Sequence, residues 1–253
     1  MEDKPVIQEQ TYPTEVIDLP SSGMFYPENS PLRSGQIELK YMTAKEEDIL
    51  TSTNLIQKGV VLDKLMDSLI VTKGVKSADL LVGDLNAVMV ASRILGYGKD
   101  YDAIIPCPIC DKQIEQTVDL TQLDTKNEPD SDTTEFSTTL PVSKVTVVLK
   151  LLTRGDELKI EEENKKIKKA TGTVGESTAR LRSIIKSVDG DSSIAKIWNF
   201  VENMLVKDAR YLREYYSSII PDVDFDIDIE CDCTDTENKA RLPIGTRFFW
   251  PDS

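Results

Sequence analysis

The chain has 253 residues and a net charge of −14, from 30 Lys and Arg against 44 Asp and Glu, and it contains no histidine. Such an acidic chain disfavours binding to nucleic acid, whose phosphate backbone is also negative. The lack of histidine excludes Ser-His-Asp and Cys-His catalysis, HExxH metalloproteases and His-ligated metal sites. This length is enough for one large or two small domains with a buried core.

The N-terminal sequence MEDKPVIQEQTYP is polar and acidic, without the basic and apolar regions of a signal peptide. No segment approaches the roughly 18 apolar residues that a membrane span requires. We therefore expect a protein that stays in a cytoplasm and has no membrane partner. In that reducing compartment its four cysteines are metal ligands or free thiols rather than disulfides.

Residues 1–35 are predicted to form an extended N-terminal arm, because four prolines disfavour helix along it. Three large apolar side chains lie in the arm, at Met24, Phe25 and Tyr26. Burying each of them gains roughly 1.5–3 kcal/mol, so they must pack either on the protein itself or on a partner.

Residues 36–100 are predicted to form a strand followed by helices. The sequence QIELKYMT, which ends at Thr43, alternates as a half-buried strand does. Thr43 and Glu46 have capping-box spacing, in which the Thr43 hydroxyl accepts from the Glu46 amide and Glu46 reaches back to the Thr43 amide. Apolar spacing and glycines predict helices over 43–58, 61–71 and 84–95.

The remaining chain divides by composition and periodicity. We predict a strand-turn-strand knuckle over 101–125, a polar linker over 126–135, an α/β region over 136–220 and C-terminal strands over 221–253 that pair with the knuckle.

Within the α/β region, residues 154–170 read as a charged helix, and the run KKIKK is interpreted as its solvated C-terminus. Residues 180–188 fit a strand or a short helix. An amphipathic helix is predicted over 194–205, and Asp208 is predicted to cap the next one. The C-terminal sequence DVDFDIDIEC alternates strictly, and we interpret its carboxylates as a solvated strand face because the spacing of a calcium loop is missing.

The cysteines form two pairs, Cys107-Pro-Ile-Cys110 and Cys231-Asp-Cys233. A C-P-x-C turn between two strands is typical of a zinc knuckle, whose backbone amides orient the thiolates. Redox activity would require the second cysteine of the first pair to begin a helix, but an alternating sequence follows it. Four thiolates would make a closed, structural zinc site, although the second pair has a shorter spacer than standard knuckles. Free cysteines remain the alternative.

These features predict an α+β fold, with a helical N-terminal part and a mixed α/β C-terminal part joined by a small antiparallel zinc-ribbon-like β module. The sequence contains no P-loop, GxGxxG or nucleophile signature. We therefore expect a protein without enzymatic activity.

Several stretches also carry a family resemblance. The sequence LPSSGMFYPENSPL, followed by IELKYMTAKEEDIL, resembles the baseplate hub assembly protein family of T4-like contractile-tailed bacteriophages, and so do the second cysteine pair, LPIG and FFWP. The resemblance implies a non-enzymatic viral protein that assembles the tail baseplate hub by binding phage hub or tail proteins, alone or as a homo-oligomer. It implies action in the host cytoplasm, as an assembly chaperone or as a hub component retained in the virion.

Two apolar clusters are the candidate partner-binding surfaces. They comprise Met24, Phe25 and Tyr26 in the arm and Phe248, Phe249 and Trp250 near the C-terminus. We assign a partner to the arm, because the C-terminal cluster follows the cysteine strands directly and can fold back on them.

The alternative function is a zinc-ribbon interaction module of a cellular nucleic-acid machine. Such a ribbon needs Lys and Arg around the metal, whereas residues 222–237 contain eight acidic residues and no basic one. A cysteine-dependent enzyme would need a cationic cluster beside its thiolate, and the sequence provides none.

Overall fold

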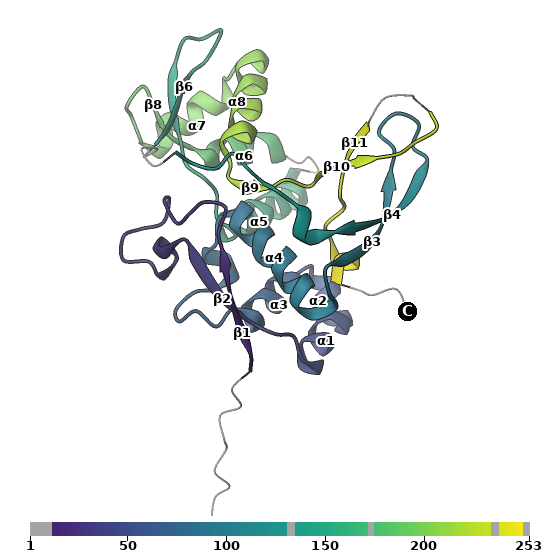
Figure 1. Cartoon of the computed structure of the whole chain (residues 1–253). Helices are drawn as coiled ribbons and strands as arrows, with labels where there is room; N and C mark the ends of the chain where they lie inside the picture. The colour runs from purple at the N-terminus through teal and green to yellow at the C-terminus, as the bar shows by residue number, and fades with distance from the viewer. Residues whose placement is uncertain (1–11, 131–134, 172–174, 234–237, 250–253) are drawn as a thin grey trace, which may run out of the picture.

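The computed structural model describes residues 12–130, 135–171, 175–233 and 238–249 (Figure 1). The described residues form eight α-helices and small antiparallel sheets, which is the mixed α and β composition that the sequence predicts. The helices are α1 Ala44–Thr51, α2 Thr53–Lys58, α3 Val61–Leu69, α4 Val82–Tyr97, α5 Arg154–Thr171, α6 Glu176–Ile184, α7 Ile194–Glu202 and α8 Val206–Ile219.

Every strand pair among the described residues is antiparallel, and four of the five sheets have two strands. The pairs are β1 with β2, β3 with β4, β5 with β9 and β10 with β11, while β6, β7 and β8 form the three-stranded sheet. The strands are β1 Thr14–Asp18, β2 Gln36–Lys40, β3 Asp100–Pro106, β4 Gln113–Asp119, β5 Thr125–Lys126, β6 Phe136–Thr139, β7 Thr146–Leu149, β8 Ile185–Val188, β9 Asp222–Val223, β10 Asp226–Ile229 and β11 Asn238–Arg241.

Several elements differ from the prediction for identifiable reasons. The helix expected over 43–58 divides at Ser52, whose ψ of 102° is extended, and it ends at Gly59, which has a φ of +70°. The ambiguous segment 180–188 contains the end of α6 followed at once by β8. Asp208 lies inside α8, and its carboxylate accepts from the amides of Val142 (2.8 Å) and Ser143 (2.9 Å) in a distant loop.

The hydrophobic residues form two adjoining cores. Helices α1 to α4 of the first core lie below helices α5 to α8 of the second in Figure 1. The first combines β1 to β4, α1, α3 and α4 with the C-terminal strands and Phe248 and Phe249. The second is built from buried residues between Leu140 and Tyr216, on β7, β8 and α5 to α8. Leu151 packs against both cores, so they meet at the start of α5.

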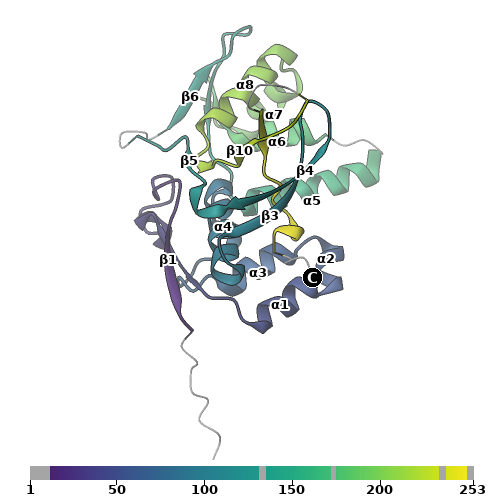
Figure 2. The same ribbon diagram turned by 45° about the vertical axis from the view of Figure 1, so that its right-hand side comes forward.

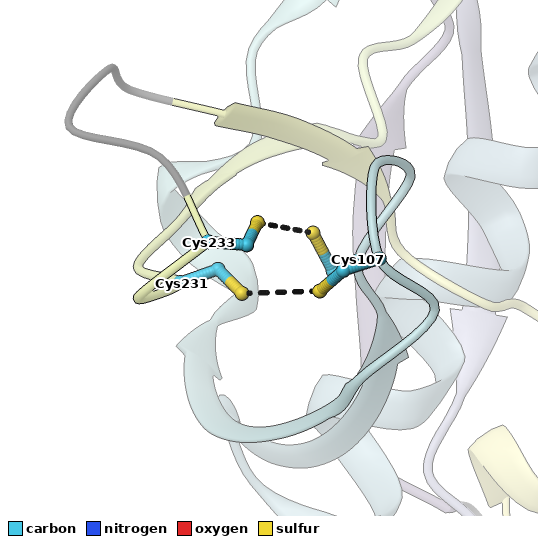
Figure 3. A group of neighbouring side chains, drawn as sticks. Cys107, Cys231 and Cys233 are labelled. Atoms are coloured by element: carbon cyan, nitrogen blue, oxygen red, sulfur yellow. Dashed lines mark hydrogen bonds between the residues drawn. The ribbon is translucent and has the colours of Figure 1, made fainter.

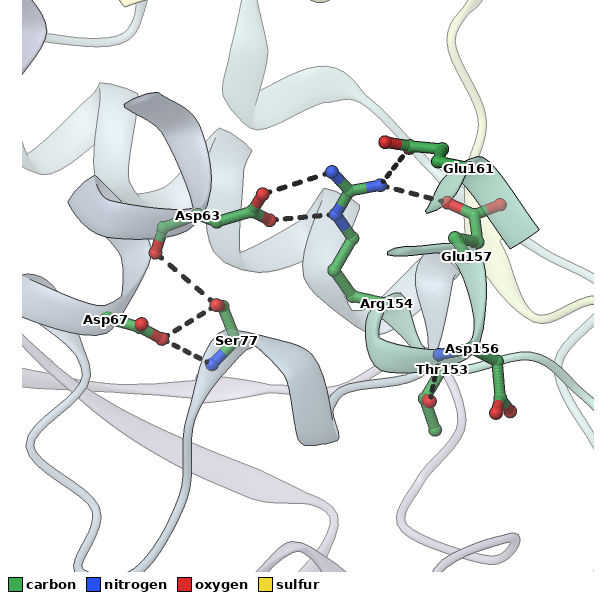
Figure 4. Close-up of polar contacts among 8 residues, drawn as sticks. All are labelled: Asp63, Asp67, Ser77, Thr153, Arg154, Asp156, Glu157 and Glu161. Atoms are coloured by element: carbon green, nitrogen blue, oxygen red, sulfur yellow. Dashed lines mark hydrogen bonds and ion pairs between the residues drawn. The ribbon is translucent and has the colours of Figure 1, made fainter. Parts of the chain in front are cut away.

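An arginine bridges the two halves at this junction. Arg154, the first residue of α5, donates from Nε to Asp63 Oδ1 (2.8 Å) and from Nη2 to Asp63 Oδ2 (3.1 Å) on α3 (Figure 4). On its other side Arg154 pairs with Glu161 at 3.0 Å. The bidentate contact with Asp63 raises the pKa of Arg154 and fixes the orientation of α5 against α3.

The N-terminal arm packs on α4 of the protein itself, which corrects the assignment of Tyr26 to a partner. Tyr26 is 7% exposed, and its hydroxyl donates to Asp84 Oδ2 at 2.7 Å while accepting from the Leu81 amide at 2.8 Å. Ser21 donates to the same carboxylate from its amide and its hydroxyl. Phe25 is half-buried, with its ring 5.1 Å from that of Phe136. A carboxylate buried at the start of α4 needs these donors, so the arm is part of the fold.

Met24, the third residue of the arm cluster, is also half-buried.

The C-terminal cluster lies in the first core. Phe248 and Phe249 are fully buried, so they are core residues and not a partner surface. The Phe248 ring meets Tyr101 edge-on at 4.9 Å, and Arg93 Nε donates to the Phe248 carbonyl at 2.9 Å. Trp250, the last residue of that cluster, lies outside the described residues.

The start of α1 has half of the expected capping box. The Glu46 carboxylate accepts from the Thr43 amide at 2.9 Å as predicted, but the Thr43 hydroxyl donates to this carboxylate at 2.6 Å. Lys40 and Ser68 donate to the same buried carboxylate at 2.8 and 2.6 Å. Burial would raise the pKa of Glu46, but these donors outweigh it and lower the pKa to about 2.

The Glu46 site predicts a pH-dependent effect on stability. Because the folded pKa lies below the ordinary value of 4.5, the charged carboxylate stabilises the fold above pH 4.5, and this contribution falls as the pH drops toward 2. Glu46→Gln should lower the free energy of unfolding by about 2 kcal/mol at pH 7. Urea unfolding should show the difference from the native protein shrinking below pH 4.5. A constant difference across this range would contradict the prediction, and Glu47→Gln on the exposed side of the helix is the control.

The arm contact predicts that Tyr26→Phe destabilises the protein by about 1–3 kcal/mol, because the Leu81 amide loses its acceptor and Asp84 loses a donor. Thermal or urea unfolding measures this loss. Tyr41→Phe is the matched control, since no hydrogen bond of that hydroxyl is found among the described residues. Equal stability of the two variants would mean that the arm does not depend on Tyr26.

Candidate metal centre

Two β-hairpins bring the cysteines together. The hairpin of β3 and β4 carries Cys107 and Cys110 in its turn, and the segment between β10 and β11 carries Cys231 and Cys233. The hairpins lie side by side in both views of the fold (Figures 1 and 2). Gln116 Nε2 on β4 donates to the Asp228 carbonyl on β10 at 3.2 Å. Each hairpin pairs its own two strands, so the predicted pairing of the C-terminal strands with the knuckle is replaced by packing between hairpins.

The first cysteine pair lies in a tight turn. The Cys107 amide donates to the Lys112 carbonyl at 2.9 Å, and the Asp111 amide donates to the Cys107 carbonyl at 2.9 Å. Asp111 has a φ of +56°, a left-handed conformation that Asp tolerates better than most side chains. This turn folds Cys110 back toward Cys107, so that both sulfurs face the second hairpin.

The four sulfur atoms converge across the two hairpins (Figure 3). All four Sγ atoms lie within 4.8 Å of one another, and Cys107–Cys233 and Cys110–Cys231 are each separated by 3.6 Å. A disulfide needs about 2.05 Å between sulfurs, so these pairs are thiols. Sulfurs at about 2.3 Å from a tetrahedral zinc lie roughly 3.8 Å apart, so this arrangement is close to that of a zinc site.

Backbone amides favour the thiolate form of Cys107, the first cysteine of the turn. Hydrogen bonds from the amides of Ile109 and Cys110 lower the pKa of Cys107 to about 7, so this thiol loses its proton readily. The neighbouring sulfur of Cys231 raises the pKa of Cys233 to about 12. Four thiols this close cannot all ionise unless a cation balances them, and a divalent metal would supply that charge.

An ion pair beside the cysteines also links the two turns that carry them. Lys112 Nζ and Asp232 Oδ2 form an ion pair at 3.1 Å across the two turns. Cys107 is buried, whereas Cys110 and Cys233 are exposed. The sequence pattern found all four cysteines, but it did not single out Lys112 and Asp232, whose partnership depends on the packing of residues 120 positions apart.

The described part of the chain contains no helix that is both long enough and apolar enough to span a bilayer. The family model for the T4 bacteriophage base plate protein matches residues 13–250, which is nearly the whole sequence. Searches of curated proteins and of solved structures gave no match. The chain therefore belongs to the T4 bacteriophage base plate protein family.

Proposed function

We propose that this base plate protein is a non-enzymatic assembly factor or component of the hub of a contractile tail, and that it acts by binding other tail proteins. The family match over residues 13–250 supports the base plate role. The resemblance of the arm and first helices to hub assembly proteins supports the hub as its place. Binding alone is sufficient for this role, and we propose no reaction.

We propose further that the four cysteines hold one structural zinc ion. The observation that carries this is the convergence of four Sγ atoms within 4.8 Å from segments more than 120 residues apart. Four thiolates fill a tetrahedral shell, which leaves no position for a metal-bound water. The ion would therefore hold the hairpins together, and with them the C-terminal segment that carries Phe248 and Phe249 into the first core.

The function is tested in cells infected with a phage that lacks this gene. We expect hub assembly to fail without the protein and to be restored by the native chain from a plasmid. Cross-linking and mass spectrometry of assembling baseplates should place the protein beside hub proteins. Normal hubs without it, or cross-links confined to proteins outside the hub, would contradict the proposal. Its presence or absence in purified virions then separates a component from an assembly factor.

The metal proposal predicts about one zinc per chain in protein purified without added metal, measured by elemental analysis. Cys110→Ser should abolish zinc binding and lower the melting temperature, because the metal would no longer hold the two hairpins together. Lys112→Ala is the matched control, since it removes the neighbouring ion pair and keeps all four ligands. Native protein that contains no zinc and four freely titrating thiols would contradict the metal site while leaving the family assignment unchanged.

A further inference from the structure

A groove runs along most of α5, between this helix and the N-terminal half of α6, with Arg213 of α8 alongside. The helices α5, α6 and α8 lie together in the upper half of the molecule (Figure 2). Its volume is about 650 Å³, within the range of about 300–1,000 Å³ that ligand sites occupy. It lies in the second core region, away from the cysteines. The lining residues are Glu157, Ile160, Glu161, Asn164, Lys165, Lys168, Ser177, Arg180 and Arg213.

The groove carries uncompensated positive charge. Its two carboxylates are already paired, Glu157 with Arg180 at 3.2 Å and Glu161 with Arg154 at 3.0 Å. Lys165, Lys168 and Arg213 form no ion pair with any described residue, and Arg213 Nη1 donates only to Ser177 Oγ, at 3.2 Å. Lys168 and Arg213 lack a carboxylate partner among the described residues, and Lys165 lies beside them, near Glu162. In a chain with a net charge of −14, these cations in one hollow form a local site for an anionic ligand.

Two further features of the groove indicate which chemical groups its ligand should carry. Asn164 is 9% exposed, and its Oδ1 has no hydrogen-bond partner among the described residues, so the ligand should bring a donor. A second cavity of about 240 Å³ shares Ser177, Arg180 and Arg213 with the groove. Half of its lining residues are apolar or aromatic, namely Leu181, Ile184, Tyr216 and Ile220, so it would accept a large apolar side chain.

We propose that this groove binds an acidic segment of a partner polypeptide in which carboxylates stand next to a large apolar side chain. Such a segment supplies carboxylates for Lys165, Lys168 and Arg213, a backbone N–H for Asn164 and an apolar group for the second cavity. An inorganic anion such as phosphate carries neither the apolar group nor the donors of a peptide backbone. A long nucleic acid would be repelled by the rest of this acidic surface, whereas a short segment meets mainly the local charge.

The probe is a fluorescein-labelled synthetic nonapeptide that alternates Asp with Leu and Phe, added to the full chain and followed by fluorescence polarisation. We expect binding that weakens as salt is raised, and no binding of the same peptide with Asn in place of Asp. The double variant Lys168→Ala/Arg213→Ala should weaken binding about tenfold, because two cations facing the ligand are lost.

The matched control is Lys166→Ala/Arg210→Ala, which changes the net charge equally on the same two helices. Those cations pair with Glu162 at 2.7 Å and Glu214 at 2.8 Å and do not line the groove. An equal loss of binding in both double variants would overturn the proposal, as would equal binding of the Asn peptide or tighter binding of a single-stranded oligonucleotide of the same charge. The proposal stands on the groove alone, so its failure would leave the base plate assignment intact.

Discussion

The buried polar groups of α4 are the constraint on which the first core depends. Asp84 is inaccessible to solvent at the first turn of α4, and burial raises the pKa of its carboxyl. The carboxylate accepts three hydrogen bonds, two from Ser21 and one from Tyr26. If the arm detached from α4, Asp84 would lose these donors and would either become exposed or stay buried without them. At the other end of the helix, Arg93 holds the carbonyl of Phe248. Helix α4 thus holds both the N-terminal arm and the C-terminal segment around Phe248.

The same helix also fixes the point at which the chain returns from the second core. A Cβ on Gly83 would lie 1.8 Å from the Pro221 carbonyl oxygen, so this close approach requires glycine. Three residues further along, Asn86 Nδ2 donates to Asp222 at 2.8 Å. The strand β9 that begins there pairs with β5, so the chain leaves for the second core and returns from it at one place. The two hairpins that carry the cysteines extend from this same region.

The sequence was informative where a structure depends on local patterns. The strand before Thr43, the helix end at Gly59 and both cysteine pairs follow from residue spacing alone, and the structure places each as expected. Apart from the division of the first helix at Ser52, the errors concern interactions over long sequence distances. Tyr26 and Asp84 are 58 positions apart, and Asp208 binds a loop 66 positions away, so neither role leaves a local pattern.

The lysine run of α5 also shows what the sequence alone cannot predict, namely which of its residues line the groove. Only Lys165 and Lys168 face the groove, whereas Lys166 pairs with Glu162 on the outer face of the helix. Which lysines line the groove depends on where α6 and α8 pack, so composition identifies a basic run without identifying a binding surface.

The wide separation of the two cysteine pairs has a consequence for biosynthesis. Cys110 leaves the ribosome 121 residues before Cys231, which at bacterial elongation rates corresponds to a delay of roughly ten seconds. During that interval the thiols of Cys107 and Cys110 lack the two cysteines that they face in the folded chain, and the first core lacks Phe248 and Phe249. The second core has all of its buried residues available before the first core can close. The order of translation therefore favours completing the second core first, while the first core closes only after Phe248 and Phe249 have been made.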